Sequence, residues 1–182
     1  MYRHIWSIIV LLTLIVSVMP GASAPAAAQT PAPPPNLPGA GVWGSSESDL
    51  FFVGHDDTGR ALILHYDGSA WSPMDTGKNP GISGVWGSSG TDVFAVGDSG
   101  TILHYDGTMW SPMSSGASAN LKGIWGSSAG DVFAVGDSGT LLHYDGKAWS
   151  PMNSGTGVQL SGVWGSSRRD VFAVGDSGTI LH

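Results

Sequence analysis

Histidine and aspartate, two residue types that bind metals, recur at fixed places along this chain of 182 residues. The recurring histidines are His65, His104, His143 and His182. The recurring aspartates, each in a Gly-Asp-Ser-Gly run, are Asp98, Asp137 and Asp176. Zinc needs its ligands about 2 Å from one point, and calcium prefers six or more oxygens. Because each histidine and each aspartate lies in a separate copy of a repeat, we expect them not to converge, and the sequence predicts no metal and no cofactor.

Four tryptophans mark the start of the copies and are the residues best suited to bind a ligand. They are Trp43, Trp86, Trp125 and Trp164, spaced 43, 39 and 39 residues apart. An indole ring there could stack on a sugar or a peptide. Packing between copies is the favoured alternative, because burying tryptophan is a large apolar gain. The candidate ligand-binding residues are therefore these four tryptophans, together with Asp98, Asp137 and Asp176.

A second tryptophan series keeps a strict spacing of 39 and consists of Trp71, Trp110 and Trp149. Such a period indicates an array of identical supersecondary units. Apolar runs bounded by Gly, Ser, Asp and Pro divide each unit into four short strands. In the second copy these are residues 83–86, 92–96, 101–105 and 110–113. The second of them is apolar on both faces, as a strand between two sheets should be.

We predict an all-β fold, a β-propeller of four-stranded blades with a repeat of about 39 residues. The rival fold is a stacked β-solenoid, whose coils usually repeat at shorter periods. Residues 41–182 hold the blades, which begin near residues 41, 84, 123 and 162. The last copy stops at His182, so about 3.5 blades are present, too few for a ring of usual size. We favour the interpretation that the chain is a fragment of a longer reading frame. The alternative is that further copies of the chain close the ring.

The two turns of each unit have their own sequence signals. Asp106-Gly107, with its copies in the first and third blades, is typical of a type I′ hairpin turn with positive φ at both residues. In the Gly-Asp-Ser-Gly turn we expect the carboxylate to accept a backbone amide and a glycine to take the left-handed conformation. The first copy makes this second turn four residues longer, as expected of replaceable loops on a rigid scaffold.

The N-terminal residues differ in composition from the repeats. Residues 5–19 are uncharged and mostly Ile, Leu and Val, which is short for a membrane span and typical of a signal peptide. We predict a signal peptide at 1–28, the alternative being an uncleaved anchor, and a Pro-rich linker at 29–40. The chain has no cysteine. We therefore predict that the protein is exported and is periplasmic, on the cell surface or extracellular. No stable membrane span is expected after the signal peptide has been cleaved.

The charge of the chain excludes one class of partner. The formal net charge is −7, and the few basic residues are scattered along the sequence. No stripe of lysine or arginine could follow a row of phosphates. Nucleic acid is therefore not expected to bind.

The repeats resemble the BNR (Asp-box) type of bacterial propeller, and especially the Ycf48-like repeats of a photosystem II assembly factor family. The resemblance rests on Val-Gly-Asp-Ser-Gly-Thr-Ile-Leu followed by His-Tyr-Asp-Gly-x-x-Trp, as at residues 96–110 and 135–149. It covers residues 41–182 and implies the propeller fold. An Asp-box usually has one residue between its Asp and Gly, whereas here Asp106 and Gly107 are adjacent. The hairpin role carries over, but no activity follows.

Asp-box propellers include sialidases, which use an arginine cluster, a Tyr and Glu pair and an acidic Asp. Beyond the predicted signal peptide, the arginines here are Arg60, Arg168 and Arg169, and the single glutamate is Glu47. The tyrosines recur identically in every complete blade, whereas a catalytic residue should be singular. Paired carboxylates for glycosidase chemistry are not evident. We therefore expect no catalytic residue and no enzyme in this chain.

Together these observations predict an exported, non-catalytic propeller that serves as a binding or assembly scaffold for a protein or peptide. This expectation rests partly on analogy at the level of the fold. A lectin-like propeller that binds glycans through its tryptophans is one alternative. The other is the N-terminal fragment of a larger sialidase-like hydrolase. Self-association is a further interaction that the sequence allows if the chain is complete.

Overall fold

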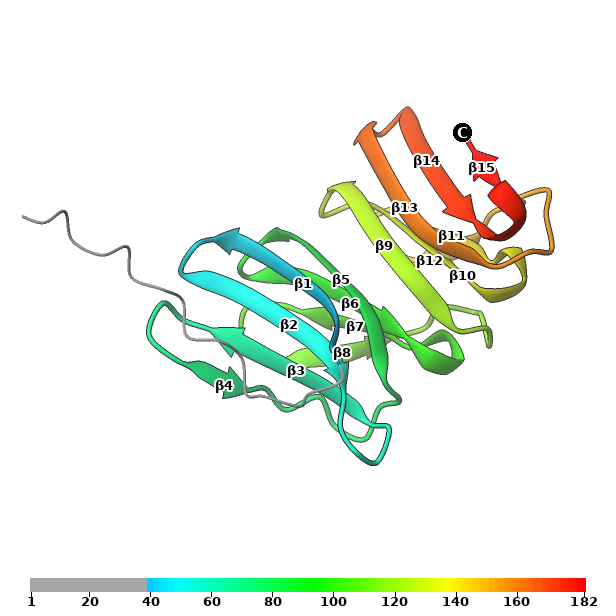
Figure 1. The fold of residues 1–182 in the computed structure, drawn as a ribbon. Helices are drawn as coiled ribbons and strands as arrows, with labels where there is room; N and C mark the ends of the chain where they lie inside the picture. Colours follow the sequence, from blue (N-terminus) through cyan, green and yellow to red (C-terminus); the bar gives the residue numbers. More distant parts are fainter. Residues whose placement is uncertain (1–38) are drawn as a thin grey trace, which may run out of the picture.

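The computed structural model describes residues 39–182, so the predicted signal peptide and nearly all of the linker lie outside the described residues. These residues form three four-stranded sheets and one three-stranded sheet, each antiparallel and each with its strands in chain order (Figure 1). The strands of the first two sheets are β1 (Gly39–Ser46), β2 (Asp49–His55), β3 (Ala61–Tyr66), β4 (Trp71–Pro73), β5 (Ile82–Ser89), β6 (Asp92–Gly97), β7 (Ile102–Tyr105) and β8 (Trp110–Met113). Those of the other two are β9 (Leu121–Ser128), β10 (Asp131–Gly136), β11 (Leu141–Tyr144), β12 (Trp149–Pro151), β13 (Leu160–Ser167), β14 (Asp170–Gly175) and β15 (Ile180–Leu181). We call the four sheets blades 1 to 4.

The first strands of neighbouring blades lie side by side, with β5 between β1 and β9, and β9 between β5 and β13 (Figure 1). The remaining strands of each blade follow outward in chain order. This is the arrangement of a β-propeller, and the four blades form part of a ring. Within residues 39–182, the helical segments are three-residue 3-10 turns, and none is long and apolar enough to cross a membrane.

The first strand of each blade is longer than the sequence suggested. In blade 2 it runs over Ile82–Ser89 rather than 83–86, because its pairing with β6 continues to Ser89 opposite Asp92. A register shift between Gly87 and Ser89 lets the strand keep pairing up to the turn. In blade 1 the same strand begins at Gly39, so the last two residues of the predicted linker are part of β1.

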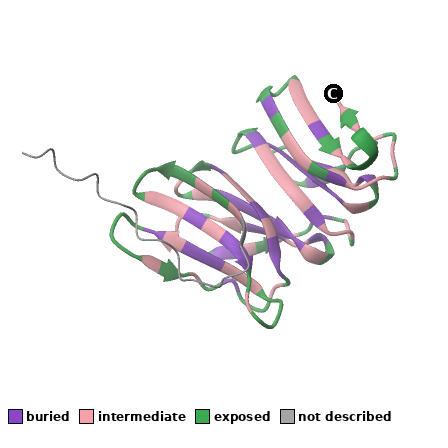
Figure 2. Cartoon of the chain, in the orientation of Figure 1, coloured by how far each residue is buried: buried purple, intermediate pink, exposed green. Residues whose placement is uncertain are grey.

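The second strand of each inner blade is covered by neighbouring blades on both of its faces, as its sequence predicts. In β6, Val93 and Ala95 belong to the apolar cluster shared with blade 1, and both are fully buried. Phe94 and Val96 point the other way and belong to the cluster shared with blade 3. The hydrophobic core of the molecule therefore lies between blades, and its buried residues follow the middle of each sheet (Figure 2).

Aromatic side chains extend this packing across each complete blade junction. Phe94 of blade 2 lies 5.6 Å, centroid to centroid, from Tyr144 and 6.3 Å from Trp149, both in blade 3. Phe51 of blade 1 makes the same pair of contacts with Tyr105 and Trp110 of blade 2. The recurring tyrosine and tryptophan of blades 2 and 3 therefore contact the phenylalanine of the preceding blade.

The tryptophan of each first strand lies over a glycine of the next blade. A Cβ atom added to Gly126 would lie 2.7 Å from Cη2 of Trp86, and the same relation joins Gly87 to Trp43 and Gly165 to Trp125. Real Cβ atoms do not approach other carbons this closely. Glycine is therefore required at these positions by the close approach of the indole ring rather than by its backbone angles.

We expect Gly126→Ala to destabilise the chain by about 1–3 kcal/mol, because Trp86 must move away from its site at the blade junction. Gly157→Ala is the matched control, since nothing lies within 4 Å of a Cβ at that position. Urea unfolding followed by tryptophan fluorescence would compare the midpoints. Equal midpoints for the two variants would contradict the role of Gly126.

Candidate functional site

A cluster of three polar side chains recurs in all four blades, and we call it the Ser-Asp-His clamp. In blade 2, Ser88 donates a hydrogen bond to Oδ2 of Asp92, and Nε2 of His104 donates to Oδ1 of the same carboxylate over 2.7 Å. The serine lies in the first strand, the aspartate begins the second strand and the histidine lies in the third. The other clamps are Ser45–Asp49–His65, Ser127–Asp131–His143 and Ser166–Asp170–His182.

The clamp holds the three residue types of a hydrolytic triad in an arrangement that cannot activate the serine. A nucleophilic serine must donate its proton to the histidine, which the aspartate orients from the other side. Here Ser88 and His104 each donate to a different oxygen of Asp92, so the serine has no base. The clamp ties three strands of a blade together and provides no catalytic nucleophile.

The recurring histidines are accounted for by this clamp and by ring stacking. The ring centroid of His104 lies 4.4 Å from that of Phe94, its partner across the strand pair. The contacts of this histidine are therefore with an aspartate and a phenylalanine of its own blade. Among residues 39–182, no group of three or more His, Asp or Glu side chains is placed to hold a metal ion.

The sequence analysis missed the aspartate of the clamp, although a signal was present. Aspartate precedes histidine by 12 residues in each of the last three copies, at Asp92, Asp131 and Asp170. A histidine on a half-buried strand needs a hydrogen-bond partner, and this carboxylate is the polar group that recurs with it. In blade 1 the spacing is 16, because the longer loop separates the two strands.

Asp98, Asp137 and Asp176 each begin a separate 3-10 turn, and these turns do not bring the carboxylates together at a metal site. The expected backbone amide bond to the carboxylate is absent from these three turns. Oδ2 of Asp137 instead accepts Nδ2 of Asn120 over 3.0 Å. Oδ1 of Asn120 accepts the amide of Ser99 in blade 2, so this side chain connects two turns. The left-handed conformation is shared by Ser99, with φ 55°, and Gly100.

The four candidate tryptophans are not equally accessible. Trp43, Trp86 and Trp125 are half-buried, each against the glycine of the next blade. Trp164 is 60% exposed, because no fifth blade covers it within the described residues. The structure therefore does not present four equivalent open indole rings, and the ligand-binding role of these residues remains a prediction.

The Asp-Gly hairpin turn differs from the expected type I′ geometry. Only the glycine has positive φ, 89° at Gly107, while Asp106 does not. Oδ1 of Asp106 accepts hydrogen bonds from the hydroxyl and amide of Thr108 and from the amide of Met109. The turn is thus closed by the side chain of its aspartate. These bonds, led by that from the Thr108 hydroxyl, lower the pKa of Asp106 to about 2.

Each blade has two ends that carry different loops. At one end, which we call the connector face, the 3-10 turns lie against the segments that join consecutive blades, as Asp98 does against Gly81. At the other end, which we call the turn face, the turn between strands three and four packs on the turn between strands one and two. Gly107 does so against Thr91 and Gly68 against Ser48. The clamps start at the turn face.

The turn face carries residues that differ in charge and size from their equivalents in other copies. Met109 is 60% exposed and stands where the other complete blades have Ala70 and Ala148. It lines a groove of about 310 Å³ between blades 1 and 2, together with Met74, Trp110 and His65. Arg168 stands where blade 3 has Ala129, and its Nε lies 3.6 Å from Asp131 of the preceding blade.

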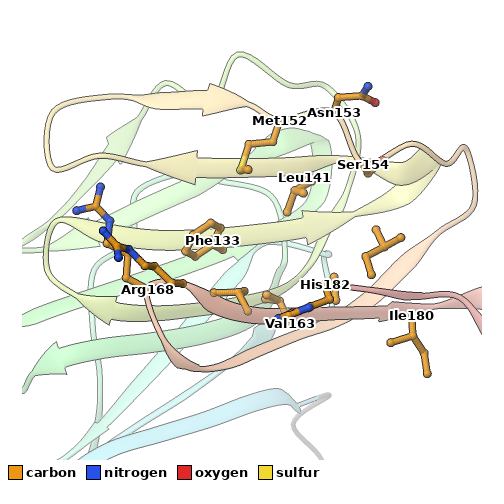
Figure 3. A pocket seen from close by; sticks show the side chains of 13 residues that line it. Phe133, Leu141, Met152, Asn153, Ser154, Val163, Arg168, Ile180 and His182 are labelled. Atoms are coloured by element: carbon orange, nitrogen blue, oxygen red, sulfur yellow. The ribbon is translucent and has the colours of Figure 1, made fainter.

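A second groove, of about 670 Å³, lies between blade 3 and β15 (Figure 3). Phe133, Leu141 and Met152 of blade 3 form one wall, with Val163, Ile180 and His182 of blade 4 opposite. In the two preceding junctions, tyrosine and tryptophan of the next blade contact the phenylalanine that corresponds to Phe133. The groove therefore corresponds to a packing position of the repeat and holds no convergent catalytic groups.

Comparison with solved structures shows that the fold is similar to that of Ycf48 propellers. A structure titled YCF48 from Cyanidioschyzon merolae superposes with a TM-score of 0.63 at 14% identity, over 78% of this chain and 49% of that one. A structure titled YCF48 bound to D1 peptide superposes with a TM-score of 0.56 at 11% identity, over 84% of this chain and 67% of that one. The chain thus spans about half the length of the first protein. These likenesses define the fold of this chain as an incomplete, Ycf48-like propeller.

Comparisons of sequence add no further assignment. No protein-family profile matches the chain, and no curated protein matches it. The BNR (Asp-box) type of repeat therefore stays a prediction from the sequence.

We expect Asp131→Ala to lower the free energy of unfolding by about 1–3 kcal/mol, because Ser127 and His143 lose their shared acceptor in a buried site. The side chain of Asp131 is 5% exposed and that of Asp170 is 44% exposed. Asp170→Ala removes the same clamp from an open blade and should cost less. Urea unfolding of both variants is the measurement, and equal losses would argue against burial as the cause.

We expect the hairpin aspartates to make the fold sensitive to acid. The pKa of Asp106 and that of Asp67 are each lowered to about 2, for Asp67 chiefly by the Ser69 hydroxyl. A lowered pKa means that the charged form stabilises the fold above pH about 3.8 and that this stabilisation is lost between pH 3.8 and about 2. Asp67→Asn with Asp106→Asn should flatten the pH dependence of the urea midpoint in that window. Parallel curves for variant and wild type would contradict the assignment.

Proposed function

We propose that this chain is an exported, non-catalytic propeller scaffold that binds a protein or peptide partner at its turn face. The observation that carries the proposal is the likeness in fold to the Ycf48 propellers, one of which is titled as bound to a D1 peptide. At 11–14% identity the likeness supports the fold, and the partner class is inferred by analogy. Export rests on the sequence of residues 1–28.

The chemistry of the clamps supports a scaffold over an enzyme. A catalytic site needs a singular group with a perturbed environment, and the clamps repeat in every blade with the serine hydrogen-bonded to a carboxylate. Glu47 is exposed in the first turn of blade 1 and Arg60 is exposed in the long loop of the same blade. These groups offer no paired carboxylates with an arginine cluster.

The turn face supports recognition because its side chains vary over a fixed backbone. Blade 1 contributes Glu47 there, whereas blades 3 and 4 contribute Lys147, Arg168 and Arg169, and the hairpin aspartate is common to all three complete blades. A partner would therefore meet an acidic end and a basic end, which fixes its direction of binding. Met109 adds an exposed, adaptable apolar contact between them, beside the groove that Met74 and Trp110 line.

A lectin-like function is the second candidate, favoured by the exposed ring of Trp164. Titration with glycans, followed by tryptophan fluorescence, separates this candidate from peptide binding. A saturable change that Trp164→Ala abolishes would favour the lectin, whereas no change across a glycan panel would remove it.

We expect peptides selected by display against the chain to bind saturably and to lose affinity, by about tenfold, in Met109→Ala or Arg168→Ala. Met109→Ala introduces the residue of blades 1 and 3, and Arg168→Ala introduces that of blade 3, so the fold should be retained. Isothermal titration gives the affinities, with Ser118→Ala on the connector side as the control. Equal affinities of the selected peptides for all variants would show that the binding site is not on the turn face. Failure to select any peptide would overturn the proposal.

A further inference from the structure

Each complete blade joins its third and fourth strands by an Asp-Gly turn whose aspartate is exposed, at residues 67–68, 106–107 and 145–146. The three turns have the same backbone. The φ of the glycine is 90°, 89° and 88°, and the amide of the aspartate donates to the carbonyl three residues later over 3.3–3.4 Å. In an Asp-Gly pair the nitrogen of the glycine can attack the aspartate carboxyl, because glycine has no Cβ to obstruct the approach. Differences in the rate of this reaction must therefore come from side-chain contacts.

The hydrogen bonds to the three carboxylates differ. Oδ1 of Asp106 accepts the hydroxyl of Thr108 over 2.6 Å in addition to two backbone amides. Oδ1 of Asp67 has the same three kinds of donor. Within the described residues, Oδ1 of Asp145 accepts two amides and no hydroxyl, because Lys147 stands where the other turns have serine or threonine. The carboxylate of blade 3 is therefore held less firmly than the other two.

The packing of each turn on its neighbour differs in the same direction. In blades 1 and 2 a Cβ added to the turn glycine would lie 2.9 Å from the Cβ of Ser48 or Thr91. In blade 3 the neighbour is Gly130, and the nearest atom to a Cβ at Gly146 is the backbone Cα of Gly130, 3.3 Å away. Among the described residues, no side chain packs there. The backbone of this turn is therefore less confined when it moves toward the reactive geometry.

The charge of the carboxyl group adds to this difference, because ring closure proceeds from the protonated acid. The pKa of Asp67 and that of Asp106 are lowered to about 2, chiefly by the hydroxyl bonds, so the acid is scarce at neutral pH. The pKa of Asp145 is also lowered, chiefly by the amide of Ala148, but without a contribution from a hydroxyl.

We propose that Asp145 is the site at which this chain undergoes spontaneous isomerisation of aspartate to isoaspartate. The nitrogen of Gly146 forms a bond to Cγ of Asp145, and water leaves with the amide hydrogen and the hydroxyl of the carboxyl group. Water then opens the cyclic imide at either carbonyl. Opening at the α-carbonyl returns the hydrogen to nitrogen and leaves the main chain running through Cγ, so that the net change is an isomerisation.

The product alters the turn and the residues that follow it. Isoaspartate lengthens the main chain by one methylene and places the free carboxylate directly on Cα, so the amide of Lys147 loses its acceptor. Trp149 follows two residues later, is 7% exposed and lies 6.3 Å from the ring of Phe94 across the blade junction. We therefore expect the modified chain to unfold at a lower urea concentration. The proposal is independent of the partner assigned to the turn face.

Ageing of the folded chain in warm neutral buffer, followed by tryptic mapping with electron-transfer fragmentation, measures isoaspartate at each turn. Trypsin separates the three turns, because Lys78 and Lys122 lie between them. Isoaspartate should accumulate at Asp145 about fivefold faster than at Asp67 or Asp106, a factor of the order that one hydrogen bond contributes. Equal accumulation at the three turns of the folded chain overturns the proposal.

Exchange of residues between blades tests the cause. Lys147→Thr with Gly130→Thr gives blade 3 the hydroxyl and the neighbouring side chain of blade 2, and should slow the reaction at Asp145 to the rate at Asp106. Thr108→Lys should accelerate the reaction at Asp106. Each substitution introduces the residue that another blade has at the same position, and the backbone of Gly130 lies outside the left-handed region, so the fold should be retained. Unchanged rates in these variants would contradict the role of the turn contacts.

The unfolded chain is the control for local sequence. Urea removes the hydrogen bonds and the packing of all three turns, so their aspartates should isomerise at similar rates in it. A preference for Asp145 that persists undiminished in urea would mean that neighbouring residues in the sequence determine the rate, and the structural assignment would be wrong.

Discussion

Each blade must cover both faces of its second strand with side chains from other blades, and the rest of the structure depends on this constraint. The strand Asp-Val-Phe-Ala-Val has apolar residues at successive positions, so it exposes one apolar face whenever a neighbour is missing. Val93 and Phe94 are buried because blade 2 has a neighbour on each side. In blade 4 the same strand has Phe172 half-buried and Val174 exposed. Stability is therefore a property of junctions between repeats, as in other one-dimensional arrays.

The polar residues of the repeat hold the strands in place for this packing, so that side chains at other positions can vary. The Ser-Asp-His clamp fixes the start of the second strand to the first and third strands, and the histidine ring then stacks on the phenylalanine of the core. Buried polar groups are stable only when they are hydrogen-bonded, and the clamp satisfies both oxygens of its carboxylate. Because the backbone at the turn face is held by clamp and hairpin together, the side chains between them can change without loss of the fold.

The sequence predicted the fold well because the same strand patterns and turn residues recur in each copy of the repeat. Strand β8, the apolar faces of β6 and the propeller class all followed from periodicity and strand patterns. The hairpin type and the extra length of β5 did not, because side-chain hydrogen bonds at Asp106 and register shifts near Ser89 depend on three-dimensional geometry. The clamp aspartate was missed for a related reason. Its partner is 12 residues away in sequence and becomes adjacent only when the strands pair.

Identity between copies also limits where specific recognition can lie. A residue that recurs in every blade is explained by a junction, a clamp or a turn, and its repetition carries no information about one partner. Met109 and Arg168 are different, because the other complete blades have alanine at the first position and the other blades have Glu47, Gly90 or Ala129 at the second, so the fold does not require these two side chains. Both are exposed, and both lie next to the preceding blade, where a partner can contact two repeats at once. In a scaffold built from near-identical units, such departures from the repeat are where selection for binding can act without disturbing the junctions.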